Sequence, residues 1–187
     1  ANLAMEHTQA ELRGWPNPIL PSKVETDASY LSALDRLLTP DSIKTLHVGS
    51  ASHNIYSLAT AVELAKARGI TSGFDIEMLA GMAVPLQRVI LDEMGSLRLY
   101  VPVVPRSEFD SAITYLVRRL EENAAPENFM SGVFDLASNE QIFARERDRF
   151  LAALSDLDPD APVPVPNRTQ NRLAEREAGI PEETGTV

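Results

Sequence analysis

Apolar residues in this chain recur at two spacings, one typical of helices and one typical of strands. After Ser22 a helical stripe of leucines runs as far as Leu38, and it stops at Pro40. Ser22 and Glu25 have the spacing of a capping box, in which the hydroxyl and the carboxylate each satisfy a free backbone N–H. This pattern predicts a helix over 22–38.

Beyond residue 40, short apolar runs alternate with further helical stripes. The runs predict strands over 45–49, 74–79 and 97–103, and the stripes predict helices over 55–68, 85–94 and 107–120. Such alternation is typical of a parallel α/β fold, either wound or closed into a barrel. Because three parallel strands would leave bare edges that natural sheets rarely expose, we expect part of a larger α/β fold.

The two ends of the chain differ from this middle part. Three prolines and a glycine in Leu12–Pro21 predict a surface loop. A last apolar stripe predicts one more helix within 137–157. The segment 158–187 begins with four prolines in Asp158–Asn167 and continues as a polar tail, a composition typical of an extended linker.

Composition narrows the class of protein. A hydrophobic content of 44% and a charged content of 24% are typical of a globular domain. The net charge of −10, from 17 Lys and Arg against 27 Asp and Glu, disfavours a nucleic-acid partner. The absence of cysteine excludes disulfides and thiolate catalysis, and the three histidines lack metal-binding spacing, so we expect no metal site.

The chain carries no sequence signal for membrane insertion or secretion. No apolar run approaches the roughly 18 residues that a membrane span needs. The first residues also lack the charged-then-apolar pattern of a secretory leader. We therefore expect a cytoplasmic protein.

Ser52, His53 and Asn54 lie between the first predicted strand and its helix. Parallel α/β proteins bind ligands at the carboxyl ends of their strands, and the helix N-terminus at such a place attracts anions. The simpler alternative is that Ser52 or Asn54 only caps the helix. The residues alone leave both interpretations open.

Arg118 and Arg119 form the most concentrated positive charge in the sequence. Two adjacent guanidinium groups can both reach one carboxylate or phosphate. On an ordinary packed helix they would instead point about 100° apart into solvent, with Glu121 and Glu122 as partners. Here too the residues alone leave both interpretations open.

Three further residues lie late in predicted strands. An inward-facing Tyr100 would approach the mouth of a barrel, although an aromatic residue there commonly packs in the core or rim. Leu79, at the end of its strand, is of a type that ordinarily belongs to the core. Glu77 is a charged residue inside a strand and needs a partner or a cavity if it is buried.

Several stretches, in order along the chain, resemble the flavin-dependent proline dehydrogenase family. The first is the opening, ANLAMEH at 1–7 with AELRGWP at 10–16. The others are SASHNIYSLA at 50–59, FDIEMLAGMAVPLQRVI at 74–90 and LRLYVPVVPRSEFDSAITYLVRRLEENAAPENF at 97–129, within which YLVRRLxEN is the most specific. The match runs from Ala1 to about Phe134. It is most similar to the bacterial bifunctional branch, proline utilization A, in which an aldehyde dehydrogenase domain follows the barrel.

The resemblance implies a fold and a set of boundaries. The fold is the carboxyl-terminal half of a (β/α)8 TIM-type barrel, with about three strands and four to five helices. Residues 1–136 would form this half-barrel, 137–157 an additional helix, and 158–187 the linker and polar tail leading toward a second domain.

The same resemblance assigns residues to a clamp on the proline carboxylate, a wall for the proline ring and contacts to FAD. They are Arg118 and Arg119 for the clamp, Tyr100 and Leu79 for the wall, with Tyr100 as the catalytic contact, and Ser52, His53 and Glu122 for FAD. The family's last helix lies over the barrel mouth, an arrangement that would let both arginines face the site.

The activity implied by the resemblance is oxidation of L-proline to 1-pyrroline-5-carboxylate. Electrons would pass from FAD to a quinone, which implies peripheral association with the inner face of the cell membrane. The remaining barrel strands and an aldehyde dehydrogenase domain would be further partners. Because barrel closure needs eight strands, we expect the 187-residue chain alone to be inactive.

Two alternatives to this activity stay open. One is a non-catalytic module that binds an amino-acid carboxylate through the arginine pair. The other is a structural or interaction part of an α/β protein, in which the arginines are solvated.

Overall fold

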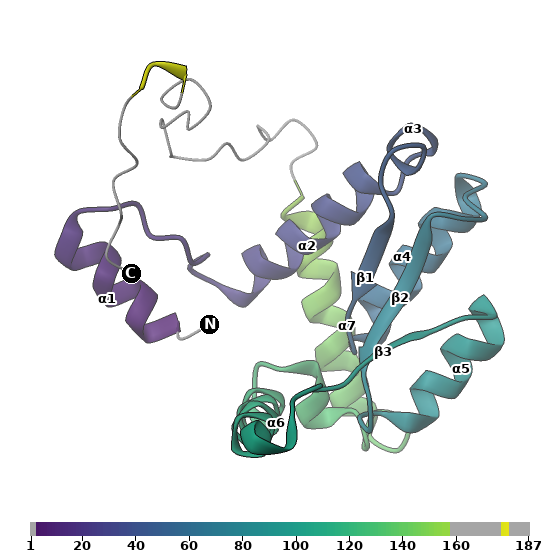
Figure 1. Ribbon diagram of the computed structural model, residues 1–187. Coiled ribbons are helices and arrows are strands. Elements are labelled where there is room, and N and C mark those ends of the chain that lie inside the picture. Colours follow the sequence, from purple (N-terminus) through teal and green to yellow (C-terminus); the bar gives the residue numbers. More distant parts are fainter. Residues whose placement is uncertain (1–2, 158–176, 180–187) are drawn as a thin grey trace. The chain divides into compact units, whose positions relative to one another are not determined.

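The computed structural model describes residues 3–157 and 177–179. The chain divides into two units, Ala1–Leu157 and Asp158–Val187, and the elements described below all belong to the first. In chain order (Figure 1) they are α1 (Leu3–Arg13), α2 (Lys23–Leu37), α3 (Pro40–Ile43), β1 (Val48–Ala51), α4 (Ile55–Ala67), β2 (Phe74–Leu79), α5 (Val84–Met94), β3 (Arg98–Tyr100), the 3₁₀ helix η1 (Arg106–Glu108), α6 (Phe109–Ala124), the 3₁₀ helix η2 (Phe129–Gly132) and α7 (Glu140–Ser155).

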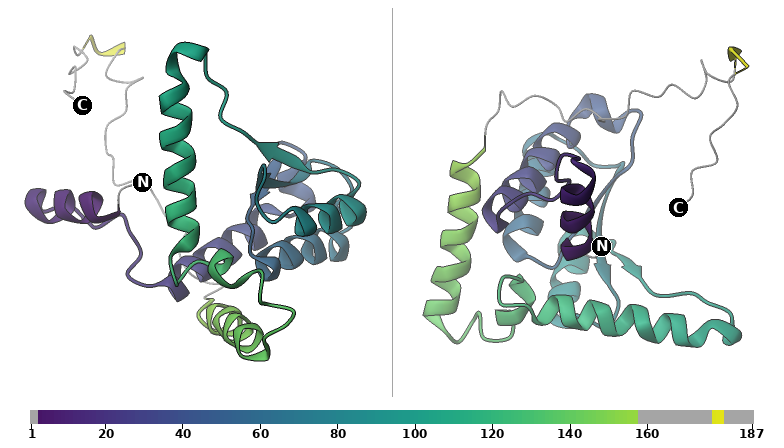
Figure 2. Two further views of the ribbon diagram at one scale, coloured as in Figure 1. Left: turned by 90° about the horizontal axis from the view of Figure 1, so that it is seen from below. Right: turned by 90° about the vertical axis from the view of Figure 1, so that its left-hand side faces the viewer.

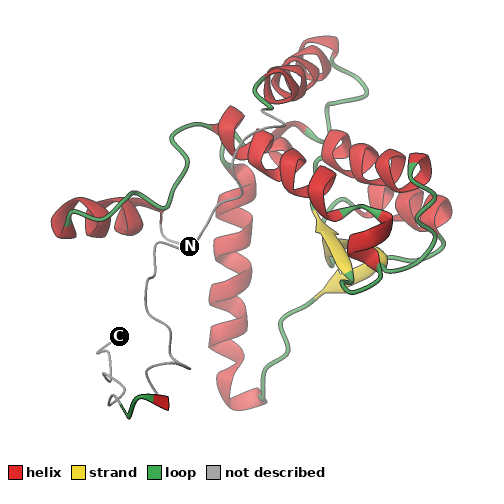
Figure 3. Cartoon of the chain, turned by 90° about the horizontal axis from the view of Figure 1, so that it is seen from above, coloured by secondary structure: helices red, strands yellow, loops and turns green. Residues whose placement is uncertain are grey.

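The three strands form one parallel sheet in the order β1-β2-β3, and they are labelled in Figure 1. Figure 3 shows the strands in yellow among the helices in red. Val48 is in register with Phe74 across the first pair of strands, and Leu79 with Tyr100 across the second. Since every strand runs the same way, their carboxyl ends meet at one edge of the sheet, which is where ligands bind in parallel α/β folds.

One face of the sheet is covered and holds the core. Side chains alternate across a strand, so every second residue of β2 (Phe74, Ile76 and Met78) is buried. They pack with buried residues of the helices on that face, α4 and α5. Figure 1 and the left view of Figure 2 show these two helices on the same side of the sheet. These buried helical residues are Leu58, Ala61, Val62, Ala65 and Ile90.

The other face of the sheet is polar. The alternate residues of β2 (Asp75, Glu77 and Leu79) and the exposed Arg98 and Tyr100 of β3 stand on it. Among the described residues β1 and β3 each pair with one neighbour only, so the sheet has two open edges. Inward-facing residues on an open sheet are what a segment of a closed barrel presents.

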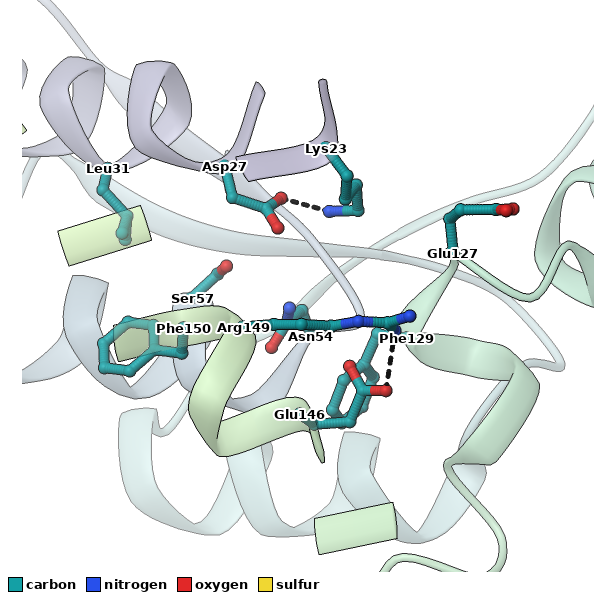
Figure 4. Close-up of a pocket in the computed structure, with 10 residues that line it drawn as sticks. All are labelled: Lys23, Asp27, Leu31, Asn54, Ser57, Glu127, Phe129, Glu146, Arg149 and Phe150. Atoms are coloured by element: carbon teal, nitrogen blue, oxygen red, sulfur yellow. Dashed lines mark hydrogen bonds and ion pairs between the residues drawn. The ribbon is translucent and has the colours of Figure 1, made fainter. Parts of the chain in front are cut away.

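Helix α7 packs on α2 through a small second core. Leu31 and Ala153 are buried there, and Phe150 stacks on Tyr56 with 5.2 Å between the ring centroids. The junction (Figure 4) encloses a cavity of about 10 Å³, which is no larger than one water molecule needs. The buried carboxylate of Glu146 beside it accepts hydrogen bonds from two arginines of α7. The junction therefore has a structural role, and its cavity is too small for a substrate.

The predicted strands and helices are present, and the boundaries of several differ. The capping box of Ser22 and Glu25 begins α2, as predicted. Helix α2 ends at Leu37, close to the predicted end, and Thr39 then caps the short helix α3, because its hydroxyl accepts the N–H of Ser42. The N–H of Leu46 then bonds to Ser42 O, so β1 begins at Val48 and not at residue 45.

Three other sequence predictions were wrong in detail. Strand β3 covers only Arg98–Tyr100, since Pro102 has no N–H to continue a ladder. Helix α6 begins at Phe109 and not at residue 107, because residues 106–108 form the separate 3₁₀ helix η1. Helix α1 was not foreseen, and it takes Leu12 and Arg13 out of the predicted loop.

Two segments bear on the predicted boundaries. Helix α7 lies inside the segment 137–157 that was expected to hold one more helix. The proline-rich segment and most of the polar tail lie outside the described residues, so the linker stays a prediction. Of the helices that the structure describes, none combines the length and the apolar character needed to cross a membrane.

Candidate active site

Four of the residues assigned to the site meet at the carboxyl ends of the strands. Here a hollow of about 200 Å³, termed below the strand-end hollow, is lined by Ala51, Ser52, His53, Glu77, Met78, Leu79 and Tyr100. Ser52 and His53 follow β1, Leu79 ends β2 and Tyr100 ends β3. The parallel sheet therefore brings together residues that lie up to 48 positions apart in the sequence.

His53 is held against the end of β2 as a neutral imidazole. Its Nε2 atom accepts the backbone N–H of Leu79 at 3.3 Å, which leaves the ring proton on Nδ1. Burial lowers the pKa of His53 below its ordinary value of 6.5. The side chain thus offers one N–H donor at the hollow and carries no charge at neutral pH.

Ser52 and Asn54 shape the turn that begins α4. Asn54 is the N-cap, and its side-chain oxygen accepts the N–H of Tyr56. Ser52 Oγ accepts the N–H of Asn54 at 3.0 Å, so its hydroxyl proton is left as a donor. Capping of the helix and binding of a ligand are thus compatible here, because the turn that caps α4 also places a hydroxyl at the strand-end hollow.

Tyr100 and Leu79 stand opposite each other on neighbouring strands. Tyr100 is 49% exposed, and its interaction with the Glu77 carboxylate raises the pKa of the Tyr100 hydroxyl. The loop after Leu79 is fixed by Gln87, whose side-chain amide donates to the carbonyls of Leu79 and Met82 at 2.9 and 2.8 Å.

The two arginines lie on α6 and do not line the strand-end hollow. Arg119 is partly buried; it donates to Glu122 at 2.6 Å, and its guanidinium carbon lies 5.3 Å from the ring centroid of Tyr115. Its Nε atom is buried and has no hydrogen-bond partner among the described residues. Arg118 is exposed. Within residues 3–157 no hydrogen bond, ion pair or cation–π contact joins either guanidinium to Tyr100 or Leu79. Glu122 is the hydrogen-bond partner of Arg119.

The carboxyl end of α6 nevertheless lies beside the strand ends. Asn123 Nδ2 is 3.0 Å from Met82 Sδ in the loop after β2. Asn123 also lines a second cavity of about 270 Å³, and this cavity shares Ser52 and His53 with the strand-end hollow. The arginine pair is therefore about one helical turn from a residue at the site.

Sequence reasoning did not assign three residues that shape this site. Gln87 had no signal beyond being polar on a helix with an apolar face, and Asn123 was visible only as the last residue of YLVRRLxEN. Glu77 had the clearest signal, a charged residue inside a strand. Its neighbours come from β1 and β3, so they are known only once the strands are placed side by side. In the part of the chain that the structure describes, no three acidic or histidine side chains gather as a metal site would need.

The sheet is parallel, has helices on one face and a polar inner face, and carries the site residues at its strand ends. These features define a segment of a TIM-type (β/α)8 barrel. A family model described as proline dehydrogenase matches residues 1–132. The chain belongs to the proline dehydrogenase family.

Known proteins with similar sequences support this membership. The chain is 31% identical over 137 residues to the bifunctional protein PutA of Klebsiella aerogenes, covering 70% of this chain and 10% of that protein. It is 32% identical over 131 residues to the mitochondrial proline dehydrogenase 1 of Dictyostelium discoideum, covering 66% of this chain and 22% of that one. The chain thus spans between about a tenth and a fifth of these relatives.

Solved structures agree on the fold. Proline utilization A from Corynebacterium freiburgense is 33% identical with a TM-score of 0.66, over 89% of this chain and 16% of that one. The enzyme from Bdellovibrio bacteriovorus, inactivated by N-propargylglycine, is 32% identical with a TM-score of 0.68, over 90% and 16%. The expected fold, part of a TIM-type barrel, is confirmed.

Proposed function

We propose that the gene product carrying this chain oxidises L-proline to 1-pyrroline-5-carboxylate with FAD as its cofactor. The observation that carries the proposal is the meeting of Ser52, His53, Leu79 and Tyr100 in the strand-end hollow. Membership of the family supports it, because proline dehydrogenases depend on a flavin.

The donors at the hollow fit a flavin. A flavin carries carbonyl and ring-nitrogen acceptors and an anionic diphosphate, and the residues expected to contact it offer uncharged or positive donors. His53 has its Nδ1 proton, Ser52 its hydroxyl proton, and the N-terminus of α4 lies beside both. We propose these two residues as FAD contacts, together with Glu122, which would act by holding Arg119.

Substrate positioning is the main task proposed for the protein. Arg118 and Arg119 would grip the carboxylate of proline, and Leu79 and Tyr100 would hold its ring, with Tyr100 as the catalytic contact. The unpaired, buried Nε of Arg119 supports an acceptor that the described residues do not supply. When bound, the flavin supplies the acceptor for the hydride that leaves the proline ring carbon, while the ring nitrogen loses a proton to give the C=N bond.

The wider setting is also a proposal. Electrons would pass on to a quinone, which requires a cytoplasmic protein to visit the inner face of the cell membrane peripherally. The relatives described as bifunctional support a second, aldehyde dehydrogenase domain joined through 158–187. The domain boundaries 1–136, 137–157 and 158–187 belong to this proposal.

The proposal is tested by purifying the gene product and measuring its visible flavin spectrum and its proline-dependent reduction of a dye. Arg118→Met and Arg119→Met should each raise KM for L-proline by about 30-fold or more, because each removes a charge-assisted bond to the carboxylate. Arg106→Met, an exposed arginine ahead of α6, is the matched control and should leave KM unchanged.

Two outcomes would count against the proposal. A gene product purified without flavin, or one that does not oxidise proline, rules out the activity. Wild-type KM in both arginine variants would mean that the guanidinium groups are solvated and grip no substrate.

A further inference from the structure

Four aromatic side chains from three elements meet beside the turn that begins α4. This aromatic cluster consists of Tyr56 of α4, Phe129 of η2, and Phe143 and Phe150 of α7. Tyr56 is its centre, because its ring stacks on Phe150 with 5.2 Å between centroids and meets the edge of Phe129 at 6.5 Å. The Phe143 ring lies 6.2 Å from it. Ring pairs at such distances attract each other beyond the area that they bury.

On one side, Tyr56 is joined to the turn that carries Ser52 and His53. The N–H of Tyr56 donates to the side-chain oxygen of Asn54 at 3.0 Å, and the N–H of Asn54 donates to Ser52 Oγ at 3.0 Å. Ser52 and His53 line the strand-end hollow. The aromatic cluster is therefore connected directly to the site.

On the other side, η2 is joined to the last turn of α6. Asn128 is the N-cap of η2, and its Oδ1 atom accepts the N–H of Met130 at 2.9 Å. Its Nδ2 atom donates to the backbone oxygen of Glu122 at 3.1 Å, and the Glu122 carboxylate accepts from Arg119. Phe129 follows Asn128 directly and is only 5% exposed. A shift of the Phe129 ring would therefore move Asn128 and its bond to α6.

Helix α7 holds η2 and the aromatic cluster in place. Gly132 of η2 is buried, and a Cβ atom added to it would lie 2.9 Å from Ile142 Cγ2, so η2 packs closely on α7. Helix α7 is in turn anchored on α2, where Phe150 packs against Leu31 and Ala153. This helix lies beyond the residues that the family model matches, so membership of the family assigns it no role.

We infer that Tyr56 is a positioning residue, which holds the last turn of α6 beside the strand ends through Phe129 and Asn128. The inference rests on the proposed function, in which the arginine pair of α6 grips the carboxylate of proline. Helix α6 has only one buried residue, Ala112, so its own packing fixes it weakly. A group that binds substrate must be held in place to be effective, and the connection through η2 holds this helix at its carboxyl end.

The experiment measures KM and kcat for L-proline, and the urea midpoint, in the complete gene product. Tyr56→Leu stays apolar but removes the three ring contacts. It should raise KM about tenfold, within the range of up to about a hundredfold that a small misplacement of a binding group costs. The change in kcat should be smaller, because a grip on the carboxylate binds the ground state and the transition state alike. Tyr56→Phe keeps the ring contacts and should restore KM to the wild-type value.

A second pair of variants tests the bond to α6 without removing a ring. Asn128→Ser keeps an oxygen that can cap η2 but removes the amide that donates to Glu122, so it should raise KM as well. Asn139→Ser is the matched control, because Asn139 is the N-cap of α7 and its side chain accepts N–H groups of its own helix. This control should leave KM unchanged.

A double variant tests whether the two residues act through one connection. Tyr56→Leu combined with Asn128→Ser should raise KM by less than the product of the two single effects, since either change already releases the end of α6. Leu151→Ala changes an exposed neighbour of Phe150 on α7 and should have no effect on KM.

The outcomes distinguish this inference from the proposed function. If the wild-type gene product does not oxidise proline, the proposed function fails and the inference with it. If proline is oxidised but Tyr56→Leu lowers the urea midpoint and leaves KM unchanged, the aromatic cluster only stabilises the fold and the inference alone fails. Single effects that multiply in the double variant would also overturn it. If Tyr56→Leu does not fold, the comparison of Asn128→Ser with Asn139→Ser decides, and equal KM values would reject the inference.

Discussion

His53 shows how a single side chain at the strand ends depends on the backbone of another strand. Its Nε2 atom accepts the N–H of Leu79, which would otherwise be a free donor at the end of β2. Protonation of Nε2 would remove this acceptor and place a charge in a half-buried site. Burial already opposes the charge, since it lowers the pKa of His53.

We expect this histidine to make stability depend on pH. The pKa of His53 lies below 6.5 in the folded protein and near 6.5 when unfolded, so between these values the unfolded chain binds more protons. Stability should therefore fall as the pH drops from about 7 toward the folded pKa, and level off below it. Urea unfolding of the gene product at pH 7.5 and 5.5 measures this, and His53→Gln should have the smaller difference. Equal pH dependence in both proteins would contradict the prediction.

At the scale of elements, the loop between β2 and α5 is the most constrained connection at the site. Ala83 has a left-handed backbone with φ of 49°, which is unfavourable for a residue with a Cβ atom. Gln87, one turn into α5, fixes the same loop by donating to two of its carbonyls. Helix α5 therefore helps to hold the loop that follows Leu79.

Gln87→Leu should destabilise the protein by about 1–2 kcal/mol, because two partly buried carbonyls lose their donor while the apolar contacts are kept. Arg88→Leu, the next and exposed position of α5, is the matched control and should have little effect. Urea midpoints of the two variants decide the matter. A loss in Gln87→Leu no greater than in its control would show that the loop holds its shape without the amide.

Elements were predictable from the sequence where local residues decide them. The capping box fixes the start of α2, and Gly95, with a left-handed φ of 72°, ends α5 as the pattern indicated. The start of β1 was not predictable, because it depends on whether α3 forms after Thr39. At the site, the hollow followed from the strand order, whereas the position of Leu79 opposite Tyr100 needs the register between β2 and β3.

At the scale of the whole molecule, two surfaces of the first unit have no partner among the described residues. One is the open face of the sheet with its charged residues. The other is the apolar side of α6, whose exposed members are Phe109, Ile113, Leu116, Val117 and Leu120. Apolar patches of this kind mark surfaces that other parts of a protein cover.

The 187-residue chain expressed alone should therefore retain little flavin and show little or no proline-dependent dye reduction. It should also bind a hydrophobic dye more strongly than the complete gene product does, because α6 is uncovered. If the isolated chain bound stoichiometric FAD and oxidised proline, the expectation that three strands cannot form the active site would be wrong.

Gly49 has no functional group, yet its lack of a side chain has an evolutionary consequence. A methyl group at this position would meet only the flexible end of Glu77, so the fold could accommodate it by moving that carboxylate. Substitutions at position 49 would then be limited by the space that the Glu77 side chain occupies. Positions 49 and 77 should accordingly covary among homologues, even though neither is expected to touch the substrate.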